Sequence, residues 1–278
     1  MFDKLIDGIE ARAREAIKPE QGDYMENGLL HCGRCKTPKQ VRLTFMGQER
    51  TPYCLCKCEA ERRDREEQEF KRRQWDERIA RNRRVGFADS ELINCTFAKD
   101  DKSNEKISNV ALSYVENFKK MREDGKGLLF FGTVGTGKTF IAAAIANALI
   151  DKGYNCLVTN FSRLVNTIQG MYAGKQDYID SLNKFDLLII DDLAAERDTE
   201  YMNEIIQMII DNRYRAHLPL IVTTNLTSDE LKNPEDIKKQ RTYSRLLEMT
   251  IPLEVKGSDR RKEKLKHDYS EYKNILGL

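Results

Sequence analysis

The chain has 278 residues, of which 40% are apolar and 33% are charged. Its 47 basic and 45 acidic side chains leave a formal net charge of only +2, so global charge does not argue for nucleic-acid binding, while a local basic surface stays open. The longest apolar runs, such as Leu187–Ile190, are far too short to cross a bilayer, and the N-terminus lacks a secretory signal pattern. We therefore expect a cytoplasmic protein.

Residues 2–17 are the first segment with helical periodicity. Their apolar side chains recur at spacings of three and four, which is typical of a short amphipathic helix. Pro19 and Gly22 then end the helix. We expect this helix to pack on its own domain, and the alternative is that it docks onto a partner protein.

Five of the seven cysteines lie between residues 32 and 58. Cys32 and Cys35 form a C-x-x-C pair, and Cys54, Cys56 and Cys58 follow as C-x-C-x-C. Four thiolates at such spacings suit a tetrahedral Zn²⁺ ion. We expect Cys32, Cys35, Cys56 and Cys58 to hold a structural zinc, with Cys54 as the alternative to one of the last two.

Residues 59–84 contain ten basic and eight acidic side chains and no glycine or proline. This composition predicts a solvated helix with ion pairs between residues four apart, which would serve as a linker. Arg81, Arg83 and Arg84 cluster at its end and leave a nucleic-acid role open, although a solvated face is the preferred interpretation.

The central motif follows an amphipathic helix predicted over residues 103–121. Gly127–Phe131 is an apolar strand, and Phe140–Ile150 is a strong helix former. The turn between them fits G-x-x-x-x-G-K-[ST], the phosphate-binding loop, whose backbone N–H groups point at a phosphate. The loop residues are Gly132, Thr133, Val134, Gly135, Thr136, Gly137, Lys138 and Thr139. Lys138 would contact the β- and γ-phosphates of a nucleotide, and the Thr139 hydroxyl would coordinate Mg²⁺.

A second motif ends in paired acids. The run Leu187–Ile190 predicts a buried parallel strand, and Asp191 and Asp192 follow it at the edge where ligands sit in open α/β sheets. Asp191 fits the Walker-B role of holding Mg²⁺. Asp192 is placed to orient or activate water, and Glu196 is the alternative for that task.

The remaining elements are predicted in the order helix, strand, helix, strand and charged tail. A helix over residues 198–216 precedes a strand that Asn225 ends, and Asn225 could reach a γ-phosphate or the attacking water. The helix over residues 240–249 presents Arg241 and Arg245 on one face. A final strand over residues 249–255 leads to the tail, which begins with a basic stretch containing Arg260 and Arg261.

This order of motifs resembles that of AAA+ ATPases, and more closely the DnaC/DnaI helicase-loader and IstB-like group. Residues 92–253 carry the resemblance, including Asn94–Phe97, Asp191–Leu193 and Ser244–Leu246. The stretch Cys56–Glu59 is similar to the cysteine module of phage and prophage loaders. The implied fold is α/β: an AAA+ P-loop core with a parallel sheet between helices, after a zinc module and a linker helix. We expect domains at residues 1–60, 61–90 and 91–278.

The resemblance also implies roles for single residues. Asn225 corresponds to sensor 1, and Arg245 to an arginine finger that acts on ATP bound by the neighbouring subunit, with Arg241 as the alternative. Arg260 or Arg261 corresponds to a sensor-2 arginine. An ion pair of Arg245 with Glu248 is the structural alternative to the finger.

Together these expectations describe an ATPase that is slow until it assembles, because the finger comes from a second subunit. Its cofactors would be ATP, Mg²⁺ and structural Zn²⁺. By resemblance it would load a hexameric DnaB-like replicative helicase onto single-stranded DNA and self-associate through ATP-bridged interfaces. The alternatives are an IstB-like helper of transposition and an adaptor that binds ATP with little turnover.

Overall fold

The computed structural model describes residues 19–45, 47–193, 199–234 and 236–276. The predicted helix over residues 2–17 and the predicted alternative acid Glu196 lie outside these ranges. The chain divides into two compact units, Met1–Asp76 and Glu77–Leu278, and the boundary falls within one helix. Within the described residues, no helix is long and apolar enough to cross a membrane.

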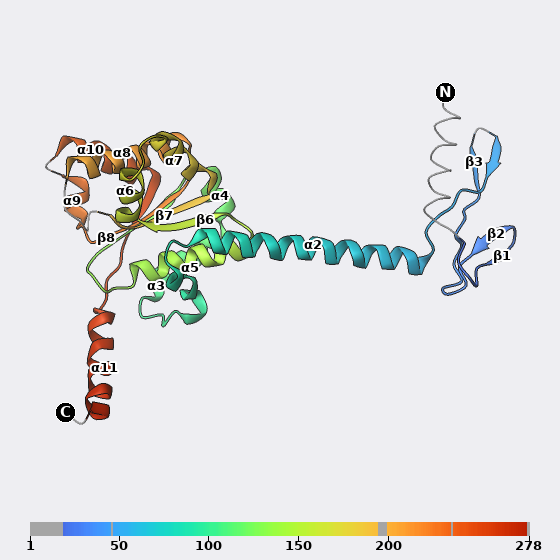
Figure 1. Ribbon diagram of the computed structural model, residues 1–278, viewed down its shortest axis with the longest axis horizontal. Helices are drawn as coiled ribbons and strands as arrows, with labels where there is room; N and C mark the ends of the chain where they lie inside the picture. Colours follow the sequence, from blue (N-terminus) through green and yellow to red (C-terminus); the bar gives the residue numbers. More distant parts are fainter. Residues whose placement is uncertain (1–18, 46, 194–198, 235, 277–278) are drawn as a thin grey trace. The chain divides into compact units, whose positions relative to one another are not determined.

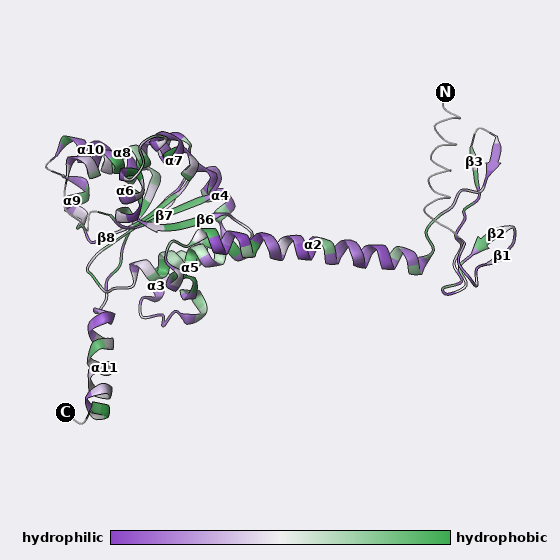
Figure 2. Ribbon diagram, in the orientation of Figure 1, coloured by the Kyte–Doolittle hydropathy of each residue, from purple (hydrophilic) through white to green (hydrophobic). Residues whose placement is uncertain are grey.

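The first unit contains two short antiparallel hairpins and the start of a long helix (Figure 1). The hairpins pair β1 (Tyr24–Glu26) with β2 (Leu29–His31) and β3 (Leu43–Phe45) with β4 (Gln48–Arg50). The helix α2 (Lys57–Gly86) matches the predicted charged linker and is mostly hydrophilic along its length (Figure 2). Ion pairs such as Arg62–Glu66 and Lys71–Glu67 join side chains four residues apart on it.

The hairpin unit is held together by a buried ion pair. The Nζ of Lys39 lies 2.6 Å from Oδ2 of Asp23, and both side chains are about 5% exposed or less. The other carboxylate oxygen of Asp23 accepts a hydrogen bond from the backbone N–H of Gly33. Gly33 must be glycine, because a Cβ there would lie 2.1 Å from the carbonyl oxygen of Gly22. Asp23 therefore fixes the turn that carries the first cysteine pair.

The second unit is built on a five-stranded parallel sheet with strand order β6-β7-β8-β5-β9. The strands are β5 (Gly127–Phe131), β6 (Cys156–Asn160), β7 (Leu187–Leu193), β8 (Leu220–Thr224) and β9 (Thr250–Glu254). The helices are α3 (Glu105–Glu116), α4 (Phe118–Glu123), α5 (Lys138–Asp151), α6 (Phe161–Gln169), α7 (Lys175–Ser181), α8 (Glu200–Arg215), α9 (Ser228–Lys232), α10 (Ile237–Met249) and α11 (Arg260–Leu276). Short 3₁₀ turns are η1 (Ser90–Asn94), η2 (Phe97–Lys99) and η3 (Leu182–Lys184).

Two apolar cores lie on opposite faces of this sheet because strand side chains alternate between faces. Leu187 and Ile189 face the core that contains α3 and α5, whereas Leu188 and Ile190 face the core of α6, α8 and α10. Figure 1 shows the sheet between these helices. The predicted α/β arrangement, a parallel sheet between two helical layers, is therefore confirmed.

Three expected elements differ from the structure. The helix predicted over residues 103–121 is divided at Asn117 into α3 and α4. Residues 40–45 have the β-branched and apolar composition typical of a strand, but only Leu43–Phe45 form one. The charged tail is the helix α11, which starts after Asp259 accepts hydrogen bonds from the backbone N–H groups of Arg261 and Lys262.

Candidate functional site

The phosphate loop connects β5 to α5 at the carboxyl edge of the sheet. Gly132 has φ 136° and Gly137 has φ 91°, a backbone conformation that side chains disfavour. Gly132 also needs to lack a side chain, because a Cβ there would lie 2.6 Å from the carbonyl oxygen of Val255. The glycines of the loop therefore stand where its backbone requires them. Lys138 follows the loop directly and is the first residue of α5.

Lys138 is only 6% exposed and is surrounded by acceptors. Its Nζ donates to the carbonyl oxygens of Gly132 (2.9 Å) and Thr133 (2.7 Å) and to Oδ1 of Asn225 (2.8 Å). Burial lowers the pKa of Lys138, while the carboxylates of Asp191 and Asp192 act in the opposite direction. Lys138 and Asn225, which were predicted separately as residues near the γ-phosphate, thus lie together, although one begins α5 and the other follows β8.

Asp191 and Thr139 meet beside the loop. The Thr139 hydroxyl donates to Oδ1 of Asp191 at 2.9 Å. Two adjacent ligands of an octahedral Mg²⁺ ion with metal–oxygen distances of about 2.0–2.1 Å lie about 2.9 Å apart, so these oxygens fit one such ion. Burial raises the pKa of Asp191, and hydrogen bonds from Thr223 and Thr139 partly offset this rise.

The two acids form a β-bulge in β7. Ile190 pairs with Val222 and Leu193 with Thr224 of β8. Two residues of β7, Asp191 and Asp192, therefore lie opposite the single residue Thr223 of β8. Asp192 has φ 57°, and its backbone N–H donates to Oγ1 of Thr223 at 3.0 Å. The bulge directs Asp191 toward Thr139 and brings Asp192 to the wall of the adjacent cavity.

Thr223 is a site residue that was not predicted from the sequence. It is fully buried, and its hydroxyl also donates to Oδ1 of Asp191 at 2.5 Å. The available signal was the pair of threonines that ends an apolar strand directly before Asn225.

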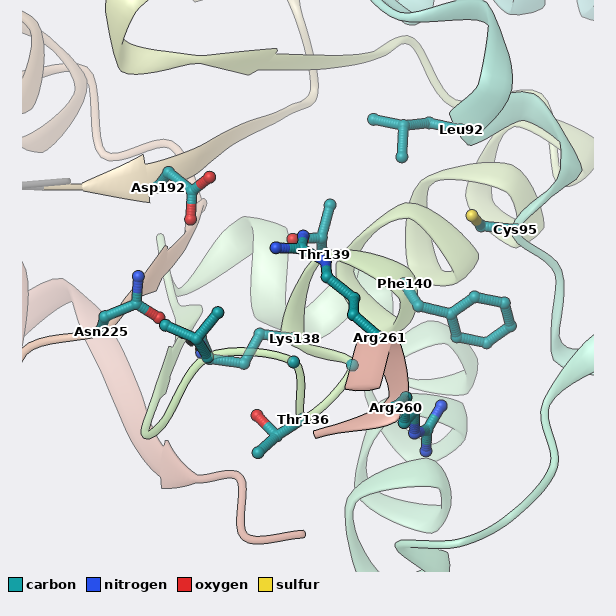
Figure 3. A pocket seen from close by; sticks show the side chains of 13 residues that line it. Leu92, Cys95, Thr136, Lys138, Thr139, Phe140, Asp192, Asn225, Arg260 and Arg261 are labelled. Carbon is teal, nitrogen blue, oxygen red and sulfur yellow. Dashed lines mark hydrogen bonds between the residues drawn. The ribbon is translucent and has the colours of Figure 1, made fainter. Parts of the chain in front are cut away.

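The loop and its neighbours enclose a cavity of about 380 Å³, which is within the size range of small-molecule sites. Its lining residues are Leu92, Cys95, Val134, Gly135, Thr136, Gly137, Lys138, Thr139, Phe140, Asp192, Asn225, Arg260 and Arg261. Figure 3 shows Lys138, Asn225 and Asp192 on one side of the cavity, and Leu92, Cys95 and Phe140 on the other. One end is therefore suited to phosphates and the other to an apolar ring.

The two candidate sensor-2 arginines make different contacts. Arg260 forms an ion pair with Asp101 at 3.0 Å, and its side chain points away from Lys138 (Figure 3). Its backbone N–H donates to the carbonyl oxygen of Gly135, which attaches the start of α11 to the phosphate loop. Burial is the main reason why the pKa of Lys138 is lowered, and the positive charge of Arg261 lowers it further. Both arginines line the cavity beside the phosphate loop.

Arg241 and Arg245 are not among the residues that line this cavity. Arg245 on α10 forms an ion pair with Asp211 of α8, and its guanidinium lies 5.8 Å from the ring centre of Tyr214. The ion-pair partner of Arg245 is therefore Asp211 and not the expected Glu248, which accepts a hydrogen bond from the Tyr214 hydroxyl. The hydrogen bond with Asp211 raises the pKa of Arg245, and the charge of Glu248 also raises it. Arg241, one turn earlier, is exposed.

A candidate metal centre lies in the first unit. The sulfur atoms of Cys32, Cys35, Cys56 and Cys58 all lie within 4.8 Å of one another. Sulfur ligands of a tetrahedral Zn²⁺ ion lie about 3.8 Å apart when each Zn–S bond is about 2.3 Å, and the Sγ of Cys58 lies 3.6 Å from that of Cys32 and 3.5 Å from that of Cys56. Cys54 is outside the cluster, where its Sγ faces the carbonyl oxygen of Pro38. The four thiols fit one zinc ion.

The thiols of this cluster differ in how readily they ionise. A hydrogen bond from Thr37 and further ones from Cys58 and the backbone lower the pKa of Cys35 to about 5. Hydrogen bonds with the other cluster thiols, first that of Cys56, raise the pKa of Cys58 to about 12. Thr37 also accepts a hydrogen bond from the backbone N–H of Lys57, so it links the first cysteine pair to the start of α2.

Comparison with known proteins identifies relatives of the chain. The family described as "IstB-like ATP binding protein" matches residues 58–267. The replicative helicase loader DnaI of Bacillus subtilis is 28% identical over 191 residues, which is 63% of this chain and 61% of DnaI. The replicative helicase loader DnaC of Escherichia coli K12 is 31% identical over 127 residues, 44% of this chain and 50% of DnaC. The match thus spans half to three fifths of these relatives' own lengths.

Solved structures agree with this fold. A crystal structure of DnaI superimposes with a TM-score of 0.53 and 26% identity, covering 65% of this chain and 99% of that one. A crystal structure of the DnaC helicase loader gives a TM-score of 0.51 and 25% identity, covering 60% of this chain and all of that one.

Proposed function

Because the chain belongs to the family of IstB-like ATP-binding proteins, we propose that it is an ATP-dependent loader of a replicative DNA helicase onto single-stranded DNA. The observation that carries the proposal is the 2.9 Å contact between Thr139 Oγ1 and Asp191 Oδ1 beside the phosphate loop. It occurs in a chain whose matched relatives are named replicative helicase loaders.

In this proposal, residues 132–139 bind the phosphates of ATP, and Thr139 and Asp191 hold Mg²⁺. When bound, Mg²⁺ neutralises negative charge on the β- and γ-phosphates. Lys138 exchanges its loop carbonyl acceptors for phosphate oxygens. Its partner Asn225 is then available to orient the attacking water.

Asp192 is the acid we assign to activating that water, because it lines the cavity beside Asn225. Arg261 contacts the γ-phosphate within the same chain. Arg245, or Arg241 one turn earlier, acts as the arginine finger on ATP bound by a neighbouring copy. Because this guanidinium comes from another subunit, hydrolysis is slow until copies of the chain assemble.

The four-cysteine cluster holds a structural Zn²⁺ ion, which fixes the hairpin unit as a docking module for the helicase. Thiolates stay available for a metal in a reducing compartment, so the proposed place of action is the cytoplasm. Nucleotide state then changes how the chain binds the helicase and DNA.

The test is co-purification with a hexameric DnaB-like helicase in the presence of MgATP or MgADP. We expect a complex whose stability differs between the two nucleotides and ATP hydrolysis that rises when helicase and single-stranded DNA are added together. Lys138→Ala is the matched variant, and it should remove both nucleotide effects while the fold is kept. Unchanged nucleotide affinity of Lys138→Ala would reject the phosphate-loop assignment.

The family match itself favours a second candidate, an ATPase helper of DNA transposition. This candidate predicts ATP-dependent assembly on duplex DNA and no complex with the helicase. A third outcome, tight ATP binding without turnover when helicase and DNA are both present, would instead indicate an ATP-switched adaptor.

A further inference from the structure

Asn147 is a buried amide in the alanine-rich helix α5, and none of the roles described above uses it. Its side chain is 3% exposed. Its Nδ2 donates to the carbonyl oxygens of Leu92 at 3.0 Å and Cys95 at 2.7 Å, as well as to Ala143 within its own helix. One amide therefore binds two backbone carbonyls, one within η1 and one directly after it, to the helix that begins at the phosphate loop.

The turn that Asn147 holds is a wall of the nucleotide cavity. Leu92 and Cys95 line the cavity, and Phe140 completes this wall from α5. Asn147 lies seven residues, about two helical turns, after Phe140, so both residues project from the same face of α5. Figure 3 shows Leu92, Cys95 and Phe140 on the side of the cavity away from Lys138 and Asn225.

We infer that Asn147 is a positioning residue for the base of the nucleotide: it holds the wall of Leu92, Cys95 and Phe140 against which an adenine ring stacks. This inference rests on the proposed ATP binding. The phosphate end of the cavity has its own supports in Lys138, Thr139 and Asp191. Asn147 should therefore control recognition of the base and leave recognition of the phosphates unchanged.

The donor groups of Asn147 carry this role. Its Oδ1 is buried without a hydrogen-bond partner in the part of the chain that the structure describes. Asn147→Leu keeps the approximate side-chain shape and removes the donors. Asn147→Asp places a carboxylate against two carbonyl oxygens and should displace the turn further.

The experiment compares binding of MgATP and of magnesium tripolyphosphate by calorimetry. For Asn147→Leu we expect MgATP affinity to fall about tenfold or more, the effect of losing roughly one well-placed interaction, and tripolyphosphate affinity to stay within about twofold. Asn212→Leu is the matched control, because Asn212 also donates its Nδ2 to a backbone carbonyl, that of Ile179, and Ile179, unlike Leu92 and Cys95, does not line the cavity. It should leave both affinities unchanged.

Equal affinities of Asn147→Leu and the unchanged protein for MgATP would overturn the inference. Equal losses for MgATP and tripolyphosphate would overturn it as well, because they would show a general structural effect. If the unchanged protein bound neither probe, the proposed function itself would fail, which is a separate result.

A second measurement needs no substitution. Cys95 is half-buried at the wall, so its alkylation can be followed by mass spectrometry of the full chain after digestion. We expect saturating MgATP to suppress labelling of Cys95 and tripolyphosphate to have no effect. Labelling that is independent of both would show that the base does not reach this wall, and it would overturn the inference even if the Asn147 variants failed to fold.

Discussion

The hydroxyl of Thr223 donates a 2.5 Å hydrogen bond to Oδ1 of Asp191, the same oxygen that accepts from Thr139. Thr223 also accepts from the backbone N–H of Asp192, so this one side chain contacts both acids of the β7 bulge. The left-handed backbone of Asp192 is held in place by the strand beside it. The geometry of the proposed magnesium site therefore depends on β8 as well as on β7.

Thr223→Val removes the two hydrogen bonds of the Thr223 hydroxyl to Asp191 and Asp192 while the fold is kept. Valine has nearly the same shape, but it leaves the Asp192 N–H and one lone pair of Asp191 without a partner, which costs about 1–3 kcal/mol of the free energy of unfolding. We expect ATP turnover to fall more than ATP affinity, because the acids shift while the phosphate loop stays. Chemical unfolding and steady-state kinetics at several Mg²⁺ concentrations measure the two effects.

Thr223→Ser is the control, since it keeps the hydroxyl and should retain most of the activity. If valine and serine behaved alike, the hydroxyl would have no part in holding the acids.

The zinc assignment predicts a difference between neighbouring cysteines. Cys56→Ser should lose the metal, because its sulfur belongs to the four-cysteine cluster, whereas Cys54→Ser should keep about one zinc per chain. Elemental analysis of protein purified under reducing conditions gives the metal content, and circular dichroism reports the fold. Zinc loss from both variants, or absence of zinc from the folded unsubstituted chain, would contradict the assignment.

The finger assignment is tested against the ion pair that Arg245 forms within its own chain. Arg245→Ala should retain ATP binding but lose the stimulation of hydrolysis by assembly, by about 10³-fold or more. Asp211→Ala breaks the same ion pair and leaves the guanidinium in place, so it should keep the stimulation. Hydrolysis is measured as a function of protein concentration with helicase and single-stranded DNA present.

Two results would change this view. Full stimulation in Arg245→Ala together with its loss in Arg241→Ala would move the finger to Arg241. Similar behaviour of Arg245→Ala and Asp211→Ala would assign Arg245 to the ion pair alone.

The sequence predicted those parts of the site that depend on short local patterns. The phosphate loop is one continuous stretch, and Leu187–Ile190 followed by Asp191 identifies a buried strand with an acid at its end. The bulge at Asp192 was not predictable, because it depends on the register between β7 and β8. Asn147 was missed for a similar reason: its partners lie 52 and 55 residues away in the sequence.

The charged tail shows a pattern that composition concealed. Leu265, Tyr269 and Tyr272 recur at spacings of four and three, which is helical, and Asp259 caps the helix that contains them. The high charge of this segment directed the prediction away from a helix. The spacing of its few apolar residues is the signal that indicates the helix.

Arg213 provides a prediction about stability that is independent of the nucleotide site. It is 1% exposed, and its guanidinium donates to the carbonyl oxygens of Leu182, Phe185, Asp186 and Pro219 at 2.9–3.2 Å. Burial lowers its pKa to about 10, so it remains charged at neutral pH. These carbonyls precede β7 and β8, at the edge of the sheet opposite the phosphate loop.

Arg213→Met should therefore destabilise the second unit by about 3–5 kcal/mol, because it leaves buried carbonyl groups without donors. Arg213→Lys should recover only part of this loss, since an ammonium has three donors and lacks the planar fork of a guanidinium. Arg215→Met is the matched control, as Arg215 is exposed on the same helix. Denaturant unfolding should distinguish the three variants, and MgATP affinity below the transition should be the same in all of them. If Arg213→Met were as stable as Arg215→Met, the four carbonyl contacts would contribute nothing to the stability of the fold. If folded Arg213→Met bound MgATP more weakly than the unchanged protein, the contacts of Arg213 at one edge of the sheet would influence the nucleotide site at the other.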